Sequence, residues 1–329
     1  MTSGSHQDRR PRAPAMRIGA AALLALALAG LGVLVLTARP APLAAQPTQA
    51  TDEPEEHANR VVYEYGAPKT DALASVYKLM TTNGCLEKIQ RIFKPFKFPI
   101  DVTLRAKSCD GLENAWYQRP DVTVCYEYIL ADILRNVPKE TTRAGVTPED
   151  AMVGPFIYTM AHEMGHAVFD LMNVPLFGRP EDAADQFSAY MMLLVGKTEA
   201  RRLIGGAAYT YARYFDAPKI TTTVTAFADV HSAPLARFYN LLCIAYGADP
   251  QQFGYVVQQG YLPADRARGC KIEFEEINYA FRNLIQPKLD PQMMTEVLSV
   301  DWYREMEPRA STAPSFIKKP PGSTPYYRR

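Results

Sequence analysis

The sequence predicts an α+β fold, because two different patterns follow each other along its 329 residues. Short segments of alternating apolar and polar residues gather before residue 130, and this is the spacing of β-strands. After Pro148 the apolar residues recur at helical spacing over most of the remaining chain. A sheet followed by helices is typical of α+β domains. We therefore expect a small mixed sheet followed by a mainly helical C-terminal half.

The sheet elements are expected first along the chain. Helical spacing covers residues 70–93, with a break at Asn83-Gly84, and the segment IDVTLRAK at 100–107 alternates as a strand. Residues 114–118 and 122–129 flank the tripeptide Arg-Pro-Asp, which is a turn signal, so they predict a β-hairpin.

The helical half is expected to belong to the same folded domain as the sheet, at residues 61–308. Residues 1–50 are interpreted as a signal peptide or membrane anchor plus the start of a linker, and 51–60 as the rest of that linker. Residues 309–329 are expected to form a disordered, Pro-rich tail. The expected helices of the second half are 150–172, 180–196, 198–215, 234–247 and 264–285.

An export signal is expected at the N-terminus. Four arginines precede an uncharged stretch from Ile18 to Thr37, which is long enough to span a bilayer at about 1.5 Å per residue. Because the positive charge comes before this stretch, the rest of the chain is predicted to be exported. A cleaved signal peptide and a retained anchor both stay open, and only a retained anchor would make the membrane a partner.

The charge pattern argues against nucleic acid as a partner. The chain has 36 basic and 35 acidic residues, and it contains neither a basic block nor an aromatic-basic stripe.

The five cysteines can form disulfides if the chain is exported. Cys109 and Cys125 flank the first strand of the predicted hairpin, and Cys243 and Cys270 lie in neighbouring predicted helices. These two pairings would leave Cys85 unpaired. Sequence does not fix the connectivity, and five buried thiols are the alternative.

The segment HEMGH at 162–166 is the main indication of a function. Positions four apart lie on one face of a helix, so His162 and His166 can bind one Zn²⁺ at about 2.0–2.1 Å. Glu163 directly follows the first histidine and could act as a base on a water beside the metal. A histidine pair without metal is the simpler alternative. The motif favours zinc, and a catalytic zinc needs a third protein ligand.

The third ligand is expected at the start of the next helix, in the segment RPEDAADQF at 179–187. Pro180 suits the first helical position, and acidic residues suit the first turn. Glu181 and Asp185 share a face, so we assign Glu181 as the ligand and Asp185 as the acceptor for the far nitrogen of a zinc-bound histidine. Asp182 is the rival ligand, but it points about 100° away from Glu181. A solvated helix start is the alternative without function.

These two motifs carry a family resemblance. HExxH followed by E-x-x-A-D resembles the gluzincin branch of zinc metallopeptidases. A wider segment, with NAWY, CYEY and RFYNLLCIAYG, resembles a bacterial metallopeptidase family that has no settled substrate. The resemblance implies a zincin-like fold with an edge strand above the HExxH helix, Zn²⁺ as cofactor, and a peptide or protein substrate. For an exported bacterial protein it implies a place in the periplasm, free or on the membrane anchor, or secretion.

Substrate-binding residues are expected in the first strand of the hairpin. The segment NAWY at 114–117 resembles the edge strand above the zinc in thermolysin-like enzymes, where Asn and Ala bind the peptide. We therefore assign Asn114 and Ala115 to the substrate, which would be held by strand addition. An ordinary hairpin strand is the alternative.

A second catalytic group is expected in the segment FADVHSAPLARFYN at 227–240. His231 could donate a hydrogen bond to the oxyanion of peptide hydrolysis, with Asp229 accepting from its other nitrogen. A helix-capping or core role is the alternative for His231. Arg237 is a candidate for substrate binding, with a structural ion pair as the alternative. Less specific candidates are Tyr209, Tyr211 and Tyr214.

Together these features predict an exported zinc metallopeptidase with Glu163 as general base. One alternative is a non-catalytic, zinc-containing binding or scaffold protein of the envelope, and another is an envelope scaffold without metal. The intact Glu163 favours the enzyme, because a purely structural zinc would not require that base. The oligomeric state stays open.

Overall fold

The computed structural model describes residues 60–196, 199–212 and 229–306. The expected signal or anchor, the linker up to residue 59, the Pro-rich tail and Tyr214 therefore lie outside the described residues. No helix within the described ranges is long and apolar enough to cross a membrane.

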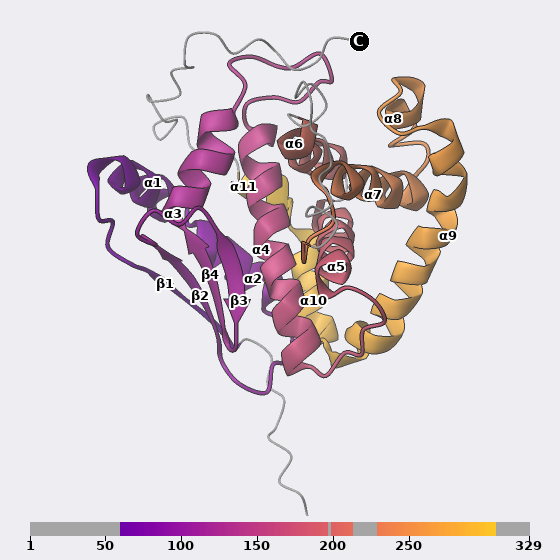
Figure 1. Cartoon of the computed structure of the whole chain (residues 1–329). Coiled ribbons are helices and arrows are strands. Elements are labelled where there is room, and N and C mark those ends of the chain that lie inside the picture. Colours follow the sequence, from indigo (N-terminus) through magenta and orange to yellow (C-terminus); the bar gives the residue numbers. More distant parts are fainter. Residues whose placement is uncertain (1–59, 197–198, 213–228, 307–329) are drawn as a thin grey trace, which may run out of the picture. The chain divides into compact units, whose positions relative to one another are not determined.

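Four strands form one mixed sheet with the order β1-β2-β4-β3 (Figure 1). β1 pairs with β2 and β2 with β4 in parallel, whereas β3 and β4 form the antiparallel hairpin. β1 is not predicted from the sequence, since only its first residue is buried and it shows no alternation. The bounds are Val61–Tyr65 for β1, Val102–Lys107 for β2, Ala115–Gln118 for β3 and Asp121–Cys125 for β4.

The second hairpin strand is shorter than predicted. It ends at Cys125, and the chain continues as the short helix α3 (Tyr126–Tyr128) and a π-helical turn at Ile129–Ile133. The prediction of a strand over 122–129 is therefore wrong from residue 126 onward. Alternation does not reveal the change, because Tyr126 is as fully buried in the helix as Val124 is in the strand.

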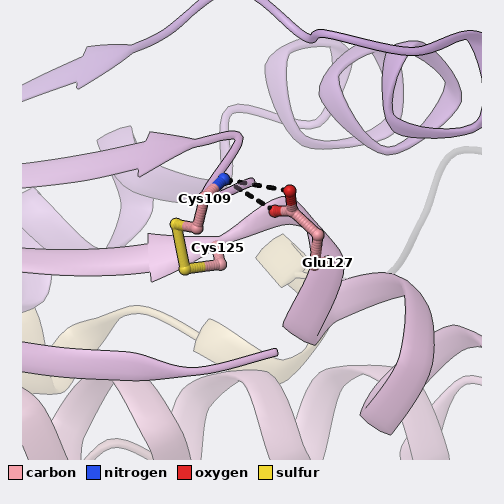
Figure 2. Close-up of side chains that lie close together, drawn as sticks. All are labelled: Cys109, Cys125 and Glu127. Atoms are coloured by element: carbon pink, nitrogen blue, oxygen red, sulfur yellow. Dashed lines mark hydrogen bonds between the residues drawn. A yellow bond between two sulfur atoms is a disulfide. The ribbon is translucent and has the colours of Figure 1, made fainter. Parts of the chain in front are cut away.

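The loop before β3 is tied to the end of β4. Cys109 and Cys125 form a disulfide, and both carboxylate oxygens of Glu127 accept the backbone N–H of Cys109 at 3.0 Å (Figure 2). Gly111 donates its N–H to the same carboxylate at 3.2 Å. The two sulfurs are bonded to each other, so this cluster is not a metal site. It holds the loop that leads to Asn114 at the start of β3.

Two helices follow β1 before the chain enters β2. They are α1 (Asp71–Thr82) and α2 (Cys85–Phe93), and the chain breaks between them where the sequence predicts. Gly84 has a φ of 58°, a left-handed conformation that glycine adopts without strain.

The helix α4 (Asp150–Leu171) lies between the sheet and the helical half of the domain (Figure 1). Of its 22 residues 17 are buried, which is why its sequence is apolar around the whole circumference. The next helices, α5 (Pro180–Gly196) and α6 (Ala200–Ala212), pack against its far side. Glycine allows the close approach of α6, since a Cβ at Gly206 would lie 1.9 Å from the carbonyl oxygen of Asp150.

The helices α7 (Pro234–Ala248) and α9 (Ala264–Ala280) pack together and are joined by the Cys243–Cys270 disulfide. Both predicted disulfides are thus confirmed, and Cys85 is free. Besides α3, three described helices are not predicted from the sequence, because the longest has nine residues and is too short to show a helical repeat. These are α8 (Tyr255–Gln258), α10 (Pro291–Ser299) and α11 (Trp302–Met306).

Candidate metal centre

The two histidines of the HExxH motif lie on the buried central helix. His162 and His166 are about one turn of α4 apart, and their Nε2 atoms are 3.3 Å from each other. Because α4 is packed between the sheet and the other helices, it presents both rings to one place.

Glu181 reaches the same place from the first turn of α5. Its Oε2 atom lies 3.0 Å from Nε2 of His162 and 3.3 Å from Nε2 of His166. The chain reverses between α4 and α5 through Asn173 and Gly178, which have φ values of 49° and 114°. This reversal brings the start of α5 back beside the histidines.

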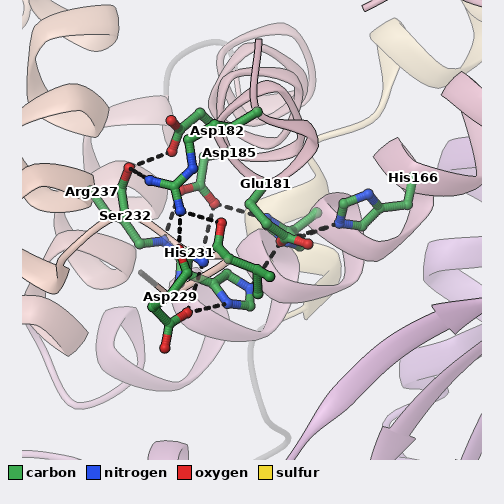
Figure 3. A network of polar contacts seen from close by, with 11 residues as sticks. His166, Glu181, Asp182, Asp185, Asp229, His231, Ser232 and Arg237 are labelled. Atoms are coloured by element: carbon green, nitrogen blue, oxygen red, sulfur yellow. Dashed lines mark hydrogen bonds and ion pairs between the residues drawn. The ribbon is translucent and has the colours of Figure 1, made fainter. Parts of the chain in front are cut away.

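Asp182, the rival ligand, points to a different partner. Its Oδ1 atom accepts a hydrogen bond from Oγ of Ser232 at 2.6 Å (Figure 3). Of the two acidic residues in the first turn of α5, Glu181 is therefore the one that contacts the histidines.

The donor set of His162, His166 and Glu181 fits a zinc ion. Bonds of about 2.0–2.2 Å in tetrahedral geometry place neighbouring ligand atoms roughly 3.3–3.6 Å apart. The three separations observed here are 3.0, 3.3 and 3.3 Å. Two imidazoles and one carboxylate are also a donor set of catalytic zinc sites, in which a fourth position stays open.

Asp185 lies behind the site, one turn after Glu181. Its Oδ1 atom accepts from Nδ1 of His162 at 2.8 Å, which leaves Nε2 of that ring for a metal. Arg237 of α7 binds the same carboxylate through Nε and Nη2, both at 2.7 Å (Figure 3). Arg237 thus forms the structural ion pair that was the alternative to substrate binding.

These contacts shift the pKa values of the network. Burial disfavours the imidazolium of His162, but hydrogen bonds to Asp185 and Glu181 outweigh it and raise its pKa to about 9. Burial would raise the pKa of Asp185, but its bonds with His162 and Arg237 hold that pKa well below its usual range. Hydrogen bonds with the histidines hold the pKa of Glu181 far below its usual range. Both carboxylates are therefore ionised at neutral pH and can balance a cation.

Glu163 lies beside the ligands and is almost fully buried, with 7% of its surface exposed. Its carboxylate is within 4.8 Å of ring nitrogens of His162 and His166. Burial raises the pKa of this carboxyl group, so the proton is exchanged at a pH closer to neutral. That property suits a general base.

His231 lies in the loop before α7 and also reaches the centre. Its Nε2 atom is 2.9 Å from Oε2 of Glu181, and its ring stacks at 6.0 Å from the ring of His162. The structure differs from the expectation for Asp229. That aspartate accepts the backbone N–H of His231 at 2.8 Å and makes only a longer ion-pair contact of 3.6 Å with Nδ1 of the ring, so its hydrogen bond goes to the loop backbone and not to the imidazole.

A cleft with two lobes runs along the candidate metal centre. Asn114, Ala115, Glu163 and His231 line both lobes, so the candidate base and the candidate oxyanion donor lie where the lobes meet. The first lobe encloses about 240 Å³ and reaches Arg237 and, among the predicted tyrosines, Tyr211. The wall of the second lobe combines polar residues with apolar side chains, among them Trp116, Phe169, Val174 and Leu176.

Among the described strands β3 forms one edge of the sheet, and this edge begins at the cleft. The carbonyl oxygen of Asn114 accepts the N–H of Cys125 at 3.0 Å. In an antiparallel pair the N–H and C=O of the next residue point away from the partner strand, so Ala115 directs these groups to the free edge of β3. An extended peptide can add as a strand at such an edge.

The sequence gives no indication of the contacts of Arg179. Its guanidinium binds the loop that carries His231, although these residues are 50 positions apart in the chain. A surface arginine before a helix carries no pattern that would assign it to a distant loop.

One comparison with known proteins identifies a family. Residues 65–285, more than half of the chain, match a family model described as "Putative metallopeptidase". The matched segment contains β3, the HExxH helix, Glu181 and the His231 loop. No curated protein and no solved structure matches the chain.

Proposed function

The chain belongs to this metallopeptidase family, and we propose that it is an exported, zinc-dependent peptidase. The convergence of His162, His166 and Glu181 on one point carries the proposal, because their ligand atoms lie within 3.3 Å of one another. Membership implies a metal ion, and two imidazoles favour zinc over Mg²⁺ or Ca²⁺, which prefer oxygen ligands.

The site resembles the gluzincin type, and we propose a zincin-like fold for the domain. Three features support this assignment: the glutamate ligand on the helix after HExxH, Asp185 four residues later, and the free edge of β3 at the cleft.

Each side chain at the centre has a proposed task. A bound zinc ion would polarise the scissile carbonyl and make a water more acidic. Glu163 takes the proton of the attacking water and passes it to the leaving amine, which its raised pKa favours. His231 donates from Nε2 to the developing oxyanion, since that nitrogen faces the metal ligands.

The peptide substrate is proposed to lie along β3. Ala115 offers its backbone N–H and C=O to an added strand, and Asn114 lies beside it at both lobes. Arg237 can contribute Nη1 to a substrate carbonyl in the first lobe, because Asp185 binds only its Nε and Nη2. The second lobe can take an apolar substrate side chain where Trp116, Phe169, Val174 and Leu176 line it.

A non-catalytic zinc protein is the second candidate, and one observation favours it. His231 could complete a set of four protein ligands, because its Nε2 atom is 2.9 Å from Oε2 of Glu181. Zinc sites with four protein ligands are structural. The buried Glu163 favours the enzyme, since a structural zinc needs no base where the two lobes meet.

We propose that the protein works outside the cytoplasm, in the periplasm, at the membrane or secreted, on peptides or proteins. The two disulfides support an oxidising compartment, because such bonds are rare where thiols are kept reduced.

The test is a digest of a peptide library by the purified full chain. Cleavage is expected with zinc, loss of cleavage with a chelator, and recovery after zinc is added back. Glu163→Gln protein that retains zinc serves as the control and should not cleave. Zinc-loaded wild-type protein that cleaves no peptide would support the binding or scaffold alternative instead.

A further inference from the structure

Arg179, which lies just before α5, holds the loop that carries His231 through hydrogen bonds. From Nη2 this side chain donates to the carbonyl oxygens of Asp229 and Val230, the latter at 2.6 Å. From Nη1 it donates to Oγ of Ser232 at 3.4 Å. These acceptors lie on both sides of His231, so one guanidinium binds the whole turn.

A second contact joins the loop to α5. Ser232 donates from Oγ to Oδ1 of Asp182 at 2.6 Å (Figure 3). Arg179 and Asp182 stand on either side of Glu181 in the sequence. The segment that supplies the proposed metal ligand therefore also fixes the loop that supplies His231.

In the described part of the chain, the guanidinium of Arg179 makes its hydrogen bonds to the loop that carries His231. No carboxylate of the described residues lies within 4.0 Å of its guanidinium, whereas Arg237 and Arg202 both form ion pairs. Hydrogen bonds from a charged donor are stronger than those between neutral groups. Loss of the Arg179 side chain should therefore loosen the loop without breaking an ion pair of the described residues.

The loop has little internal support for the position of His231. The side chain of His231 is 43% exposed, and that of Asp229 is 59% exposed. The bond from the N–H of His231 to Asp229 shapes the turn, but it does not determine where the turn lies relative to Glu181. Exposed loops with few buried contacts open easily. The hydrogen bonds from Arg179 and Asp182 therefore determine the position of the imidazole.

We propose that Arg179 and Asp182 are positioning residues that hold His231 against Glu181. The inference rests on the proposed function, because it assumes that His231 acts on the substrate. Glu181 and His231 would then both be positioned by the start of α5 and the arginine just before it. An error of about 1 Å in such a group can lower a rate roughly 10²-fold.

Four variants of the full chain test the proposal: Arg179→Gln, Arg179→Lys, Asp182→Asn and, as a matched control, Arg60→Gln. Arg60 also donates to a backbone carbonyl and lines neither lobe of the cleft. The first readout is hydrogen exchange of the peptide that covers residues 229–233, together with zinc content. Arg179→Gln should speed the exchange of this peptide about 10-fold, with zinc content unchanged, and Arg60→Gln should leave the peptide as in wild type.

The second readout is kinetic. Arg179→Gln should lower kcat about 10–100-fold and change KM little, because the variant displaces a group that acts in the transition state. Arg179→Lys, which keeps the charge, should recover part of the loss. In a His231→Ala background, Arg179→Gln should cause no further loss of kcat, since both changes remove the same contribution.

Three results would overturn the proposal. They are an unchanged exchange rate of the loop peptide in Arg179→Gln, loss of zinc from that variant, or an equal loss of kcat with and without His231. A wild-type protein without turnover would instead contradict the proposed function. In that case the exchange of the loop peptide would still show whether Arg179 and Asp182 hold the loop.

Discussion

Nδ1 of His162 and Oδ1 of Asp185 are 2.8 Å apart and form a hydrogen bond between α4 and α5. Because the ionised carboxylate can only accept, Nδ1 carries the hydrogen, and Nε2 is the nitrogen that would lose its proton to bind a metal. Arg237 fixes the carboxylate in turn. The orientation of one proposed zinc ligand is thus set by residues of two other helices.

Asp185→Ala should weaken zinc binding about 10–100-fold, as expected for the partner of a ligating histidine. The measurement is a competition titration against a chromophoric chelator, with the exposed surface variant Asp265→Ala as control. An affinity equal to wild type in Asp185→Ala would show that this bond does not orient His162.

Glu163→Gln should keep the fold and the zinc but lower kcat by about 10²–10⁴-fold, since the amide cannot take a proton from water. Zinc content, melting temperature and turnover of a peptide substrate are measured on the same preparation. Undiminished turnover would remove Glu163 from the mechanism.

His231→Ala should lower kcat about 10²–10³-fold, the usual effect of losing one oxyanion donor. Zinc content should stay at the wild-type value, because the three proposed ligands remain. If zinc is lost from this variant, His231 is a fourth protein ligand, and the zinc has no open position for a water. If turnover is unchanged, another residue must stabilise the oxyanion, and Arg237 is the next candidate in the cleft.

Replacing both Cys243 and Cys270 by serine should lower the free energy of unfolding by about 3.5 kcal/mol in the chain-entropy model. The bridge closes a sequence separation of 27 residues between α7 and α9. Urea unfolding measures the change. An unaltered midpoint would mean that the bridge does not constrain the unfolded chain.

The sequence predicts the parts of the fold that carry a repeating pattern. Long helices such as α4 and α5 lie where apolar spacing indicates, and the break at Gly84 lies where a turn signal stands. β1 is not predicted because only one of its residues is fully buried, so the segment shows no alternation. The end of β4 is misplaced because Cys125 and Tyr126 are both fully buried, although one ends a strand and the other begins a helix.

The residues of the site fall into the same two groups, those that a repeating pattern predicts and those that depend on packing. His162, Glu163 and His166 follow from one helical spacing, and Glu181 with Asp185 follows from the next. The partners of Arg179 and Arg237 do not, because they depend on how α5, α7 and the loop before α7 pack. A lone arginine among apolar residues in LARFYNLLCIAYG does indicate a buried ion pair, although the pattern does not name Asp185 as its partner.

The zinc content of purified Glu181→Ala and Asp182→Ala proteins, measured beside wild type, tests the proposed metal centre most directly. The two acids are adjacent in the first turn of α5, but only Glu181 contacts His162 and His166. Zinc is expected in wild type and in Asp182→Ala, and little or none in Glu181→Ala. Full zinc content in Glu181→Ala, with loss in Asp182→Ala, would contradict this expectation.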